Sequence, residues 1–271
     1  MFSMVRAKQG WLVPQRTLDY STVTEVAGEK ATAAQIQRIH GRYYFAAGFC
    51  SGKDVLEVAC GSGQGLGLLA RHARRVTGLD LDPKLVDRAR SICRGRDNVD
   101  LVLGDAENLP FADQSFDVVI LFEAIYYLPH PARFAREAKR VLRSGGTVLV
   151  CTANRDLPDF NPSPFAHAYL GPPELRALFE AEGFSVEILG EAPVGTGLAS
   201  SAVRALKRLA VKLDLMPRTM RGKRLLKRIF MGPLVEVPAE IPDGLMVERP
   251  VPIPADLPAL GHLVIHCVAR L

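Results

Sequence analysis

Two neighbouring stretches decide the fold of this chain: Asp54-Val55-Leu56-Glu57-Val58-Ala59-Cys60-Gly61-Ser62-Gly63-Gln64-Gly65 and Val76-Thr77-Gly78-Leu79-Asp80. The first predicts a buried strand that runs into a glycine-rich turn, with a helix beginning near Gly65. The second predicts another strand, which ends in a carboxylate. Gly61 and Gly63 lack a Cβ atom, so the backbone can turn sharply there and approach a ligand closely. Together the two stretches indicate half of a nucleotide-binding fold.

The order of small residues in the turn bears on which cofactor it holds. A carboxylate at Asp80 can accept hydrogen bonds from both hydroxyls of a ribose, which indicates an adenosine-containing molecule. A dinucleotide fingerprint has the form Gly-x-Gly-x-x-Gly, and counting from Gly61 its third glycine falls on Leu66. The observed order is instead Glu-x-Ala-x-Gly-x-Gly, from Glu57 with Ala59 at the first small position. The pattern therefore argues against a dinucleotide.

The composition, 48% hydrophobic and 23% charged over 271 residues, is that of an ordinary soluble globular protein. Residues 1–8 hold no apolar run of the kind a signal peptide needs, and no window approaches the roughly 20 apolar residues of a membrane span. We therefore expect a cytoplasmic protein. The odd number of cysteines without a CxxC spacing predicts no disulfide framework and no metal site. These cysteines are Cys50, Cys60, Cys93, Cys151 and Cys267.

Hydrophobic periodicity predicts strands that alternate with helices along most of the chain. Residues 1–31 show no clear period and are expected to form an irregular arm. A helix follows from Thr32, as its N-cap, to about Phe49, with Gly41 as a weak point inside it. Further helices are predicted at 65–72, 84–93, 132–142 and 173–182. Strands are predicted at 54–58, 75–80, 99–103, 116–121, 147–152, 184–189 and 262–269. This alternation predicts a Rossmann-like, doubly wound α/β sheet of seven strands, mostly parallel with an antiparallel last strand.

Three acidic residues lie at the carboxyl ends of consecutive predicted strands. Glu57 lies near the end of the first, Asp80 ends the second and Asp105 follows the third. Open α/β sheets bind ligands beyond those ends, where the strand order reverses. Each carboxylate taken singly is more often a surface or loop residue. The ordered set predicts that all three converge on one site.

Several motifs together resemble class I S-adenosylmethionine (SAM) dependent methyltransferases of the type 11 group. The turn is similar to motif I of that family, acidic-x-Gly-x-Gly-x-Gly, with Ala59 in place of its first glycine. The stretch Gly104-Asp105-Ala106-Glu107-Asn108-Leu109-Pro110-Phe111 resembles the family's adenine-binding segment. Residues 137–146 resemble the helix and turn before its fifth strand. The resemblance covers about residues 40–190 and the last ten residues.

The resemblance implies SAM as the cofactor and a set of residues that contact it. Asp80 would bind the ribose diol, Asp105 the adenine amino group, and the turn the methionine part. The full implied set is Glu57, Ala59, Gly61, Gly63, Asp80, Leu81, Asp105, Ala106 and Phe122. The helix before the first strand often covers the cofactor in this family, so Tyr43 or Tyr44 would touch it. Core packing of an amphipathic helix is the favoured interpretation of both tyrosines, because helical spacing alone does not separate the two roles.

Methyl transfer from SAM needs donor and acceptor held in line and away from water, and a general base is optional. Candidates for such a base follow the fourth strand, namely Glu123 and Tyr126, and His167 lies in the next loop. Tyr127 and His130 are nearby alternatives. Each has a purely structural interpretation, because tyrosines suit the wall of a site and a histidine between prolines suits a turn. The catalytic residue therefore stays open.

Nucleic acid is disfavoured as the acceptor. Enzymes that methylate nucleobase amino groups carry an Asn/Asp-Pro-Pro-aromatic motif after the fourth strand, where this chain has Phe122-Glu123-Ala124-Ile125. Asn161-Pro162-Ser163-Pro164-Phe165 is similar only superficially and follows the fifth strand. No Pro-Cys pair for cytosine chemistry occurs at that position. We expect a small-molecule or lipid-linked acceptor, methylated at oxygen; the alternative is a non-catalytic SAM-binding protein of the same fold.

A strongly basic segment separates the last two predicted strands. Residues 201–230 hold ten Lys or Arg residues against Asp214 as the one acidic residue, although the whole chain has a net charge of only +5. Two amphipathic helices with basic polar faces are predicted over residues 201–231. They fit a lid over the acceptor, or peripheral contact with an anionic membrane, or, less well, RNA. The chain thus divides into an arm and lid helix (1–50), a SAM-binding core (51–192), an insertion (193–260) and a last strand (261–271).

Overall fold

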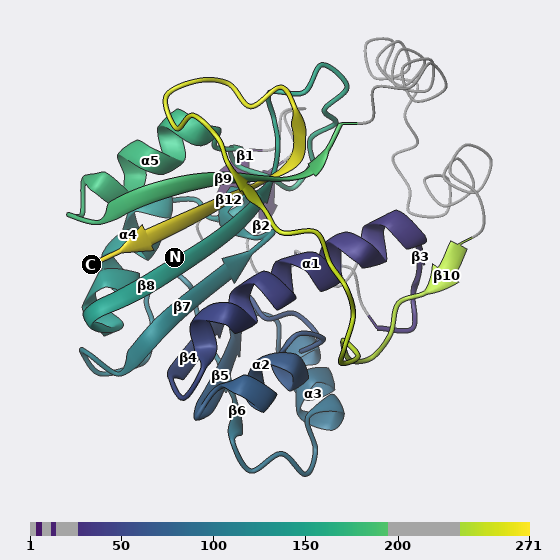
Figure 1. Cartoon of the computed structure of the whole chain (residues 1–271). Helices are drawn as coiled ribbons and strands as arrows, with labels where there is room; N and C mark the ends of the chain where they lie inside the picture. The colour runs from purple at the N-terminus through teal and green to yellow at the C-terminus, as the bar shows by residue number, and fades with distance from the viewer. Residues whose placement is uncertain (1–3, 7–11, 15–26, 195–233) are drawn as a thin grey trace.

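The computed structural model describes residues 4–6, 12–14, 27–194 and 234–271 of the chain (Figure 1). The predicted basic helices over residues 201–231 lie outside these ranges. Within them, an eight-stranded sheet has the order β11-β9-β12-β8-β7-β4-β5-β6. Its strands are β4 (Asp54–Val58), β5 (Arg75–Asp80), β6 (Val99–Leu103), β7 (Phe116–Phe122), β8 (Leu142–Ala153), β9 (Ser185–Pro193), β11 (Val251–Pro252) and β12 (His262–Arg270).

The sheet has the predicted direction pattern. Strands β6, β5, β4, β7 and β8 are parallel, and β12 runs antiparallel to both of its neighbours, β8 and β9. The seven predicted strands are all present, and the prediction missed only the two-residue strand β11 at the edge beside β9. The order reverses between β4 and β7, because the chain builds β5 and β6 on one side of β4 and β7 and β8 on the other. Ligands bind at such a reversal in open α/β sheets.

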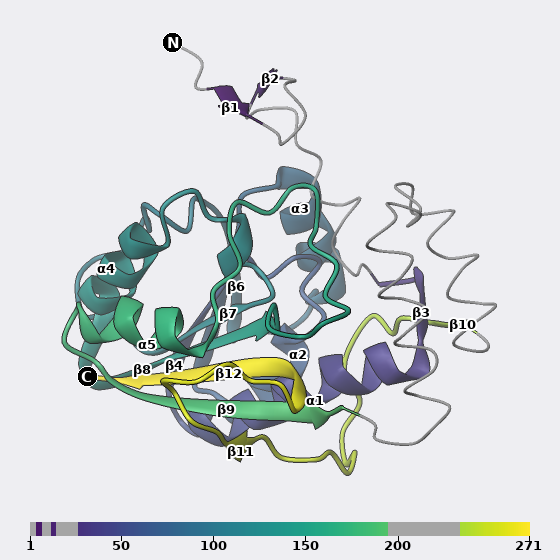
Figure 2. The same ribbon diagram turned by 90° about the horizontal axis from the view of Figure 1, so that it is seen from above.

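Helices cover both faces of the sheet (Figure 2). One apolar cluster joins the sheet to α4 (Pro131–Val141) and α5 (Pro172–Glu180). The other joins the opposite face to α1 (Ala33–Cys50) and α2 (Leu66–His72). The parallel strands alternate between the two clusters: Val55 belongs to the second and Leu56 to the first. Since successive side chains of a strand point to opposite faces, these parallel strands are buried on both faces of the sheet.

Local sequence signals explain where the main helices begin. Thr32 caps α1 by accepting from the Gln35 backbone N–H at 3.2 Å, and the Gln35 side chain bonds back to Thr32. This capping box matches the predicted start. Helix α3 (Pro83–Ile92) begins with Pro83 in the first turn, and Asp82 caps it. The helix predicted at 132–142 is observed as α4, but β8 starts at Leu142 directly after it, rather than at Thr147 as predicted.

Residues before α1 and before β12 pair with each other. Strand β3 (Lys30–Thr32) is antiparallel to β10 (Leu234–Glu236), and β1 (Met4–Arg6) pairs with β2 (Leu12–Pro14). The N-terminal arm, predicted to be irregular, therefore contains short ladders. Pairing of β3 with β10 also means that the chain after the basic segment returns to the start of α1.

This return segment, residues 234–245, lies against the helices beside β4. The Ile241 N–H donates to the carbonyl of Gln64 in the glycine-rich turn at 3.3 Å. The Tyr44 hydroxyl on α1 donates to the Pro242 carbonyl at 2.7 Å. An ion pair at 2.7 Å joins Arg71 on α2 to Asp243. The segment thus ties α1, the turn and α2 together, although it is about 170 residues later in the sequence than the turn.

Candidate functional site

The glycine-rich turn, residues 59–65, joins β4 to α2 and is buried apart from Ala59. Ala59, Gly61 and Gly63 have positive φ angles of 55°, 57° and 80°. A Cβ atom at Gly63 would lie 2.9 Å from the Cβ of Ala89 on α3, so this position accepts only glycine. Ala59 adopts the left-handed conformation with a side chain, at a cost of about 1 kcal/mol. Its place in the turn is the one where the resembled family has glycine.

Asp80 holds the turn against the end of β5. Its Oδ2 accepts from the Gly61 N–H at 2.8 Å, and its Oδ1 accepts from the Asp82 N–H at 2.9 Å. The carboxyl is 7% exposed. Burial raises its pKa, and the backbone N–H donors act in the opposite direction. Because each carboxylate oxygen has two lone pairs, Asp80 keeps acceptor capacity for a diol while it fixes the turn.

Glu57 is almost fully buried at the end of β4, with 1% exposure. The hydroxyl of Tyr43 on α1 donates to its Oε1. Burial raises the pKa of Glu57 to about 8; the Tyr43 hydrogen bond and the Arg42 charge lower the pKa, and Asp80 raises it. Two carboxyl groups therefore line the same turn, one held by backbone N–H groups and one by a tyrosine.

Three buried polar atoms around the turn have no hydrogen-bond partner among the described residues: Glu57 Oε2, Ser62 Oγ and Gln64 Nε2. Unpartnered buried polar groups cost about 1–3 kcal/mol each and are rare in native proteins. Their joint presence at one turn indicates a site that a polar ligand completes. A carboxylate oxygen, a hydroxyl and an amide nitrogen suit the ammonium and carboxylate groups of a methionine. The residues present thus fit the cofactor that the sequence motifs imply.

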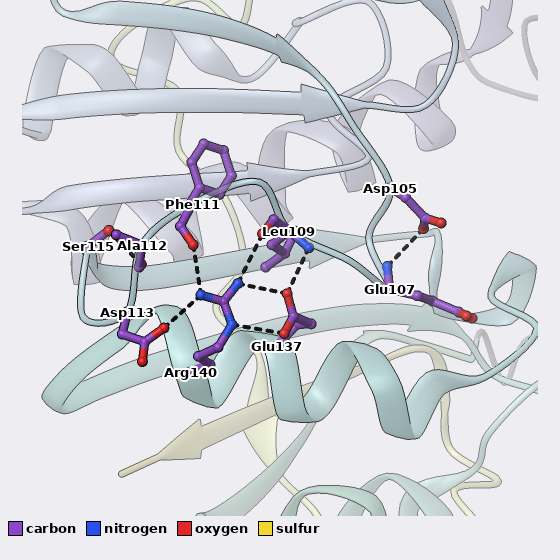
Figure 3. A network of polar contacts seen from close by, with 9 residues as sticks. All are labelled: Asp105, Glu107, Leu109, Phe111, Ala112, Asp113, Ser115, Glu137 and Arg140. Carbon is purple, nitrogen blue, oxygen red and sulfur yellow. Dashed lines mark hydrogen bonds and ion pairs between the residues drawn. The ribbon is translucent and has the colours of Figure 1, made fainter.

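The predicted adenine side of the site lies at the ends of β5 and β6. Leu81, directly after Asp80, is 57% exposed, so a large apolar side chain faces solvent beside the buried carboxylate. Asp105 is exposed, and its Oδ1 accepts from the Glu107 N–H at 2.8 Å, which closes a tight turn (Figure 3). Ala106 inside this turn is 8% exposed. The geometry leaves the second oxygen of Asp105 for another donor.

An arginine on α4 holds the segment that follows Asp105. Arg140 donates to the carbonyls of Leu109 and Phe111 at 2.9 and 2.7 Å (Figure 3). It also pairs with Asp113 and Glu137, each at 2.8 Å. Glu137 in turn accepts from the Leu109 N–H at 2.8 Å. The sequence indicated residues 137–146 by resemblance only, and no local signal shows that Arg140 anchors the loop after β6.

The opposite side of the site is built at the end of β7. Phe122 is 6% exposed, and its ring meets the Tyr43 ring edge-on at 5.4 Å between centroids. Glu123 follows with a positive φ of 52°, an uncommon conformation for this residue that often marks functional positions. Its carboxylate accepts from the Tyr126 hydroxyl at 3.0 Å and lies 3.7 Å from the Arg42 guanidinium.

The tyrosines after β7 pack with the loop that follows β8. Tyr126, in the 3-10 helix η3 (Ile125–Tyr127), stacks on Tyr169 with ring centroids 4.4 Å apart. Burial raises the pKa of Tyr126 well above its usual range, so the group stays a hydrogen-bond donor. His167 is exposed, and its backbone N–H donates to the backbone carbonyl of Tyr126 at 2.8 Å. Glu123, Tyr126 and His167 therefore lie in one region.

Other predicted residues take structural roles. The exposed His130 begins α4, and its N–H donates to Glu107. Tyr127 packs on Tyr126, with its hydroxyl 3.5 Å from Ser163. Tyr44 binds the return segment through Pro242, whereas Tyr43 is buried and bonded to Glu57. Tyr43 packs in the core, as its structural interpretation predicts, and its hydroxyl bonds to Glu57; contact of Tyr43 with the cofactor stays a prediction.

Sequence reasoning missed Arg42 altogether. Its side chain is 13% exposed and lies between the two halves of the site. It pairs with Glu123 and lowers the pKa of Glu57. A helical arginine carries no sequence signal of this kind, because only the packing of α1 on the sheet brings it to both carboxylates.

The described part of the chain contains neither a metal-binding cluster nor a membrane-spanning helix. No group of three or more His, Cys, Asp or Glu side chains in this part of the chain is placed to hold a metal ion. None of the described helices combines the length and apolarity that a membrane crossing requires.

Part of this chain is similar in sequence to known methyltransferases. Residues 56–150 match a family described as "Methyltransferase domain". A probable SAM-dependent methyltransferase of Mycolicibacterium smegmatis is 42% identical over 161 residues, which cover 57% of this chain and 61% of the relative. A phthiotriol/phenolphthiotriol dimycocerosates methyltransferase of Mycobacterium ulcerans is 50% identical over 104 residues, 36% of this chain and 37% of the relative. The chain thus matches less than two thirds of either relative.

A solved structure gives the same result for the fold. A SAM-dependent methyltransferase from Thermotoga maritima superposes with a TM-score of 0.55 at 16% identity, over 87% of this chain and 91% of the other. At such an identity the likeness concerns the fold alone, and it confirms the predicted Rossmann-like sheet. The matched domain includes the glycine-rich turn, Asp80, Asp105 and Phe122. The chain carries a methyltransferase domain of the class I, SAM-dependent family.

Proposed function

We propose that this protein transfers the methyl group of SAM to a small-molecule or lipid-linked acceptor, with oxygen as the methylated atom. The observation that carries this proposal is the pair of buried carboxyl groups, Glu57 and Asp80, around a turn with unpartnered buried polar atoms. The Tyr43 ring lies between Gly65 of the turn and Phe122 of β7, next to the point where the strand order reverses. We assign the turn to the cofactor and the residues after β7 to the acceptor.

The cofactor side assigns a part of SAM to each predicted residue. Asp80 accepts from the ribose hydroxyls, and Asp105 accepts from the adenine amino group. Leu81 and Ala106 flank the adenine, since the exposed Leu81 side chain offers apolar surface beside Asp80. Residues of the turn and Glu57 bind the methionine part, and Phe122 lies near the sulfonium. The residues of the turn in this assignment are Ala59, Gly61 and Gly63.

The acceptor side supplies a base. SAM, when bound, provides an electrophilic methyl group attached to a sulfonium. Glu123 accepts the proton that the acceptor hydroxyl loses as its oxygen bonds to that methyl group. The Tyr126 hydroxyl, 3.0 Å from Glu123 Oε2, and the Arg42 guanidinium hold the Glu123 carboxylate in place. His167, exposed on the adjoining loop, is the alternative base.

The relatives support the acceptor class. The Mycobacterium ulcerans relative is named for phthiotriol and phenolphthiotriol dimycocerosates. A triol offers hydroxyl groups, and a dimycocerosate is an ester of long acyl chains, so this name favours a lipid-linked hydroxyl as acceptor. The match includes 36% of this chain, which restricts the support to the class of acceptor. The predicted basic helices of residues 201–231 add a reason to test anionic lipids, because their charge suits such a surface.

Binding and turnover test the proposal separately. Titration calorimetry with SAM, with its demethylated product and with NAD should show binding of the first two and none of NAD. Incubation with methyl-labelled SAM and extracted cellular lipids, followed by solvent partition, should then give labelled product that survives mild alkali, as an ether does. Binding of NAD in place of SAM would refute the proposed cofactor. Binding of SAM without labelled product in the lipid or the polar fraction would favour the non-catalytic alternative.

A further inference from the structure

The residues around Tyr43 enclose its ring closely and leave no space for a larger side chain. A Cβ atom at Gly65 would overlap the ring, so only a glycine at that position admits it. On another side the ring meets Phe122 edge-on, and the Arg42 guanidinium carbon lies 5.9 Å from its centroid. Tyr43 itself is 6% exposed. The ring is therefore fixed between the glycine-rich turn and the end of β7.

The Tyr43 hydroxyl makes the two oxygens of Glu57 unequal. Oε1 accepts from Tyr43, whereas Oε2 is buried and has no hydrogen-bond partner among the described residues. A carboxylate with one oxygen held and the other unpartnered presents a single defined acceptor to a ligand. The orientation of Glu57 thus depends on a residue of α1, outside the strand and turn that form the motif.

Burial favours the neutral form of Glu57 when no ligand is bound, although the Arg42 charge and the Tyr43 hydrogen bond act against it. Among the described residues, Arg42 is the cation that acts on Glu57, and Asp80 is a second carboxylate nearby. Burial is the largest effect and raises the pKa of Glu57 to about 8. The titratable groups that face Glu57 from the packed elements are Arg42, Tyr43 and Cys50 of α1, Cys60 of the turn, Asp80 of β5 and Cys93 after α3.

We propose that Tyr43 is a positioning residue of the cofactor site, which acts through Glu57 and couples the binding of SAM to the release of one proton. This inference rests on the proposed function, because SAM supplies the positive charge. On binding, the O–H bond of the Glu57 carboxyl breaks, its proton leaves to solvent, and the cationic ligand becomes the counter-charge. Tyr43 stabilises the ionised form by its hydrogen bond.

The direction in which SAM affinity changes with pH follows from the linkage between ligand binding and proton binding. Below a pH of about 8 the free protein holds the Glu57 proton, so binding must release it and SAM affinity falls as the pH falls. Above that pH the carboxyl is already ionised and no release is needed. Replacing Tyr43 by Phe keeps the ring and removes the bond that lowers the pKa of Glu57. Proton release should then persist to a higher pH.

The experiment measures protons released on SAM binding by calorimetry in two buffers of different ionisation enthalpy. Release is taken relative to Glu57→Gln, so that titration of the ligand's own amino group cancels. From a pKa of about 8, the wild type should release roughly nine tenths of a proton at about pH 7 and roughly one quarter at about pH 8.5. Tyr43→Phe should release clearly more than the wild type at the higher pH. Tyr44→Phe is the matched control, since it also loses a hydroxyl of α1, but one bonded to Pro242.

Each outcome of the proton-release experiment supports or overturns the proposed role of Tyr43. Equal release by the wild type and a folded Tyr43→Phe variant, judged by its thermal melt, would overturn it. If Tyr43→Phe does not fold, the wild type and Glu57→Gln still decide, because equal release by these two would overturn the coupling. A change in Tyr44→Phe as large as that in Tyr43→Phe would show a general effect of α1 and would also overturn it. A wild type that binds no SAM would refute both the proposed function and this inference.

Discussion

The amide of Gly61 donates a hydrogen bond to the carboxylate of Asp80, 19 residues further along the chain. This bond joins the glycine-rich turn after β4 to the end of β5. It explains why a strand-end carboxylate and a glycine turn act as one unit: the same side chain that fixes the backbone of the turn also faces the predicted ribose. The Glu57 carboxyl on the other side of the turn is held by Tyr43 in a comparable way.

Replacement of Asp80 by Ala should weaken SAM binding by on the order of 100-fold. Two charge-assisted hydrogen bonds to the ribose, each contributing about 1.5 kcal/mol, would be lost. The turn would also lose its bond from Gly61. Calorimetric titration with SAM measures the effect, and Asp87→Ala, which removes an exposed carboxylate of α3, serves as the control. Unchanged affinity in Asp80→Ala would refute the ribose assignment.

Glu123→Gln should reduce methyl transfer by roughly 10²- to 10⁴-fold with little change in SAM affinity, because a general base contributes to the reaction step. The amide keeps the size of the side chain and an acceptor for Tyr126, which bonds to Glu123 at 3.0 Å. The measurement is label transfer from SAM to the lipid or polar fraction, alongside calorimetry. Full transfer by this variant would exclude Glu123 as the base and leave His167 as the candidate.

Two glycines close together in the sequence should respond oppositely to alanine. At Gly65 a Cβ atom would overlap the Tyr43 ring, and overpacking of this kind costs about 1–3 kcal/mol. At Gly48, within α1, the added Cβ would have no described atom within 4 Å apart from its chain neighbours and the backbone of the helix itself, and alanine in a helix gains about 1 kcal/mol over glycine. Urea denaturation of both variants measures the two free energies of unfolding. A Gly65→Ala variant as stable as the wild type would show that Tyr43 can move at no cost.

Arg140→Ala should destabilise the protein by about 2 kcal/mol, because two loop carbonyls and two carboxylates lose their partner together. The side chain is 31% exposed, so this figure allows for solvent screening of its ion pairs. SAM binding should also weaken, since the loop that contains Asp105 loses its anchor on α4. Thermal denaturation and calorimetry measure both effects.

Arg176→Ala is the matched control for Arg140→Ala. Arg176 forms an exposed pair with Glu180 at 2.8 Å within one helix, and such pairs contribute about 0.3–0.5 kcal/mol. An equal loss of stability in both variants would contradict the anchoring role of Arg140.

Much of the fold could be predicted because its signals are local. The boundaries of β5 and β6 were predicted to the residue, and Thr32 marked the start of its helix. The least accurately predicted boundary was the start of β8. Gly145 lies inside this strand with a φ of 74° and does not end the helix before it. A glycine pair breaks a helix in most contexts, but pairing of Leu142 with Phe116 overrides that tendency here.

Gly41 shows what local reasoning cannot supply. In the sequence it is a weak point of the predicted helix. In the structure a Cβ atom there would overlap the carboxylate of Glu191, which binds the fully buried His266 on the neighbouring strand. The glycine is therefore required by a contact with a residue 150 positions away. No periodicity or motif indicates such a contact.

The order of the glycine turn, Asp80 and Asp105 predicted from sequence alone that these groups meet at one edge of a parallel sheet. The resemblance of the same motifs to class I methyltransferases pointed to SAM, and the match of residues 56–150 to a methyltransferase domain agrees with it. The tertiary structure decided which groups act on those carboxyls: Tyr43 on Glu57, Arg42 on Glu123, and Arg140 on the loop after Asp105. These partners lie on helices, whose orientation follows from packing of apolar faces over long sequence separations. The spacing of residues in the sequence does not reveal how these helices pack on the sheet.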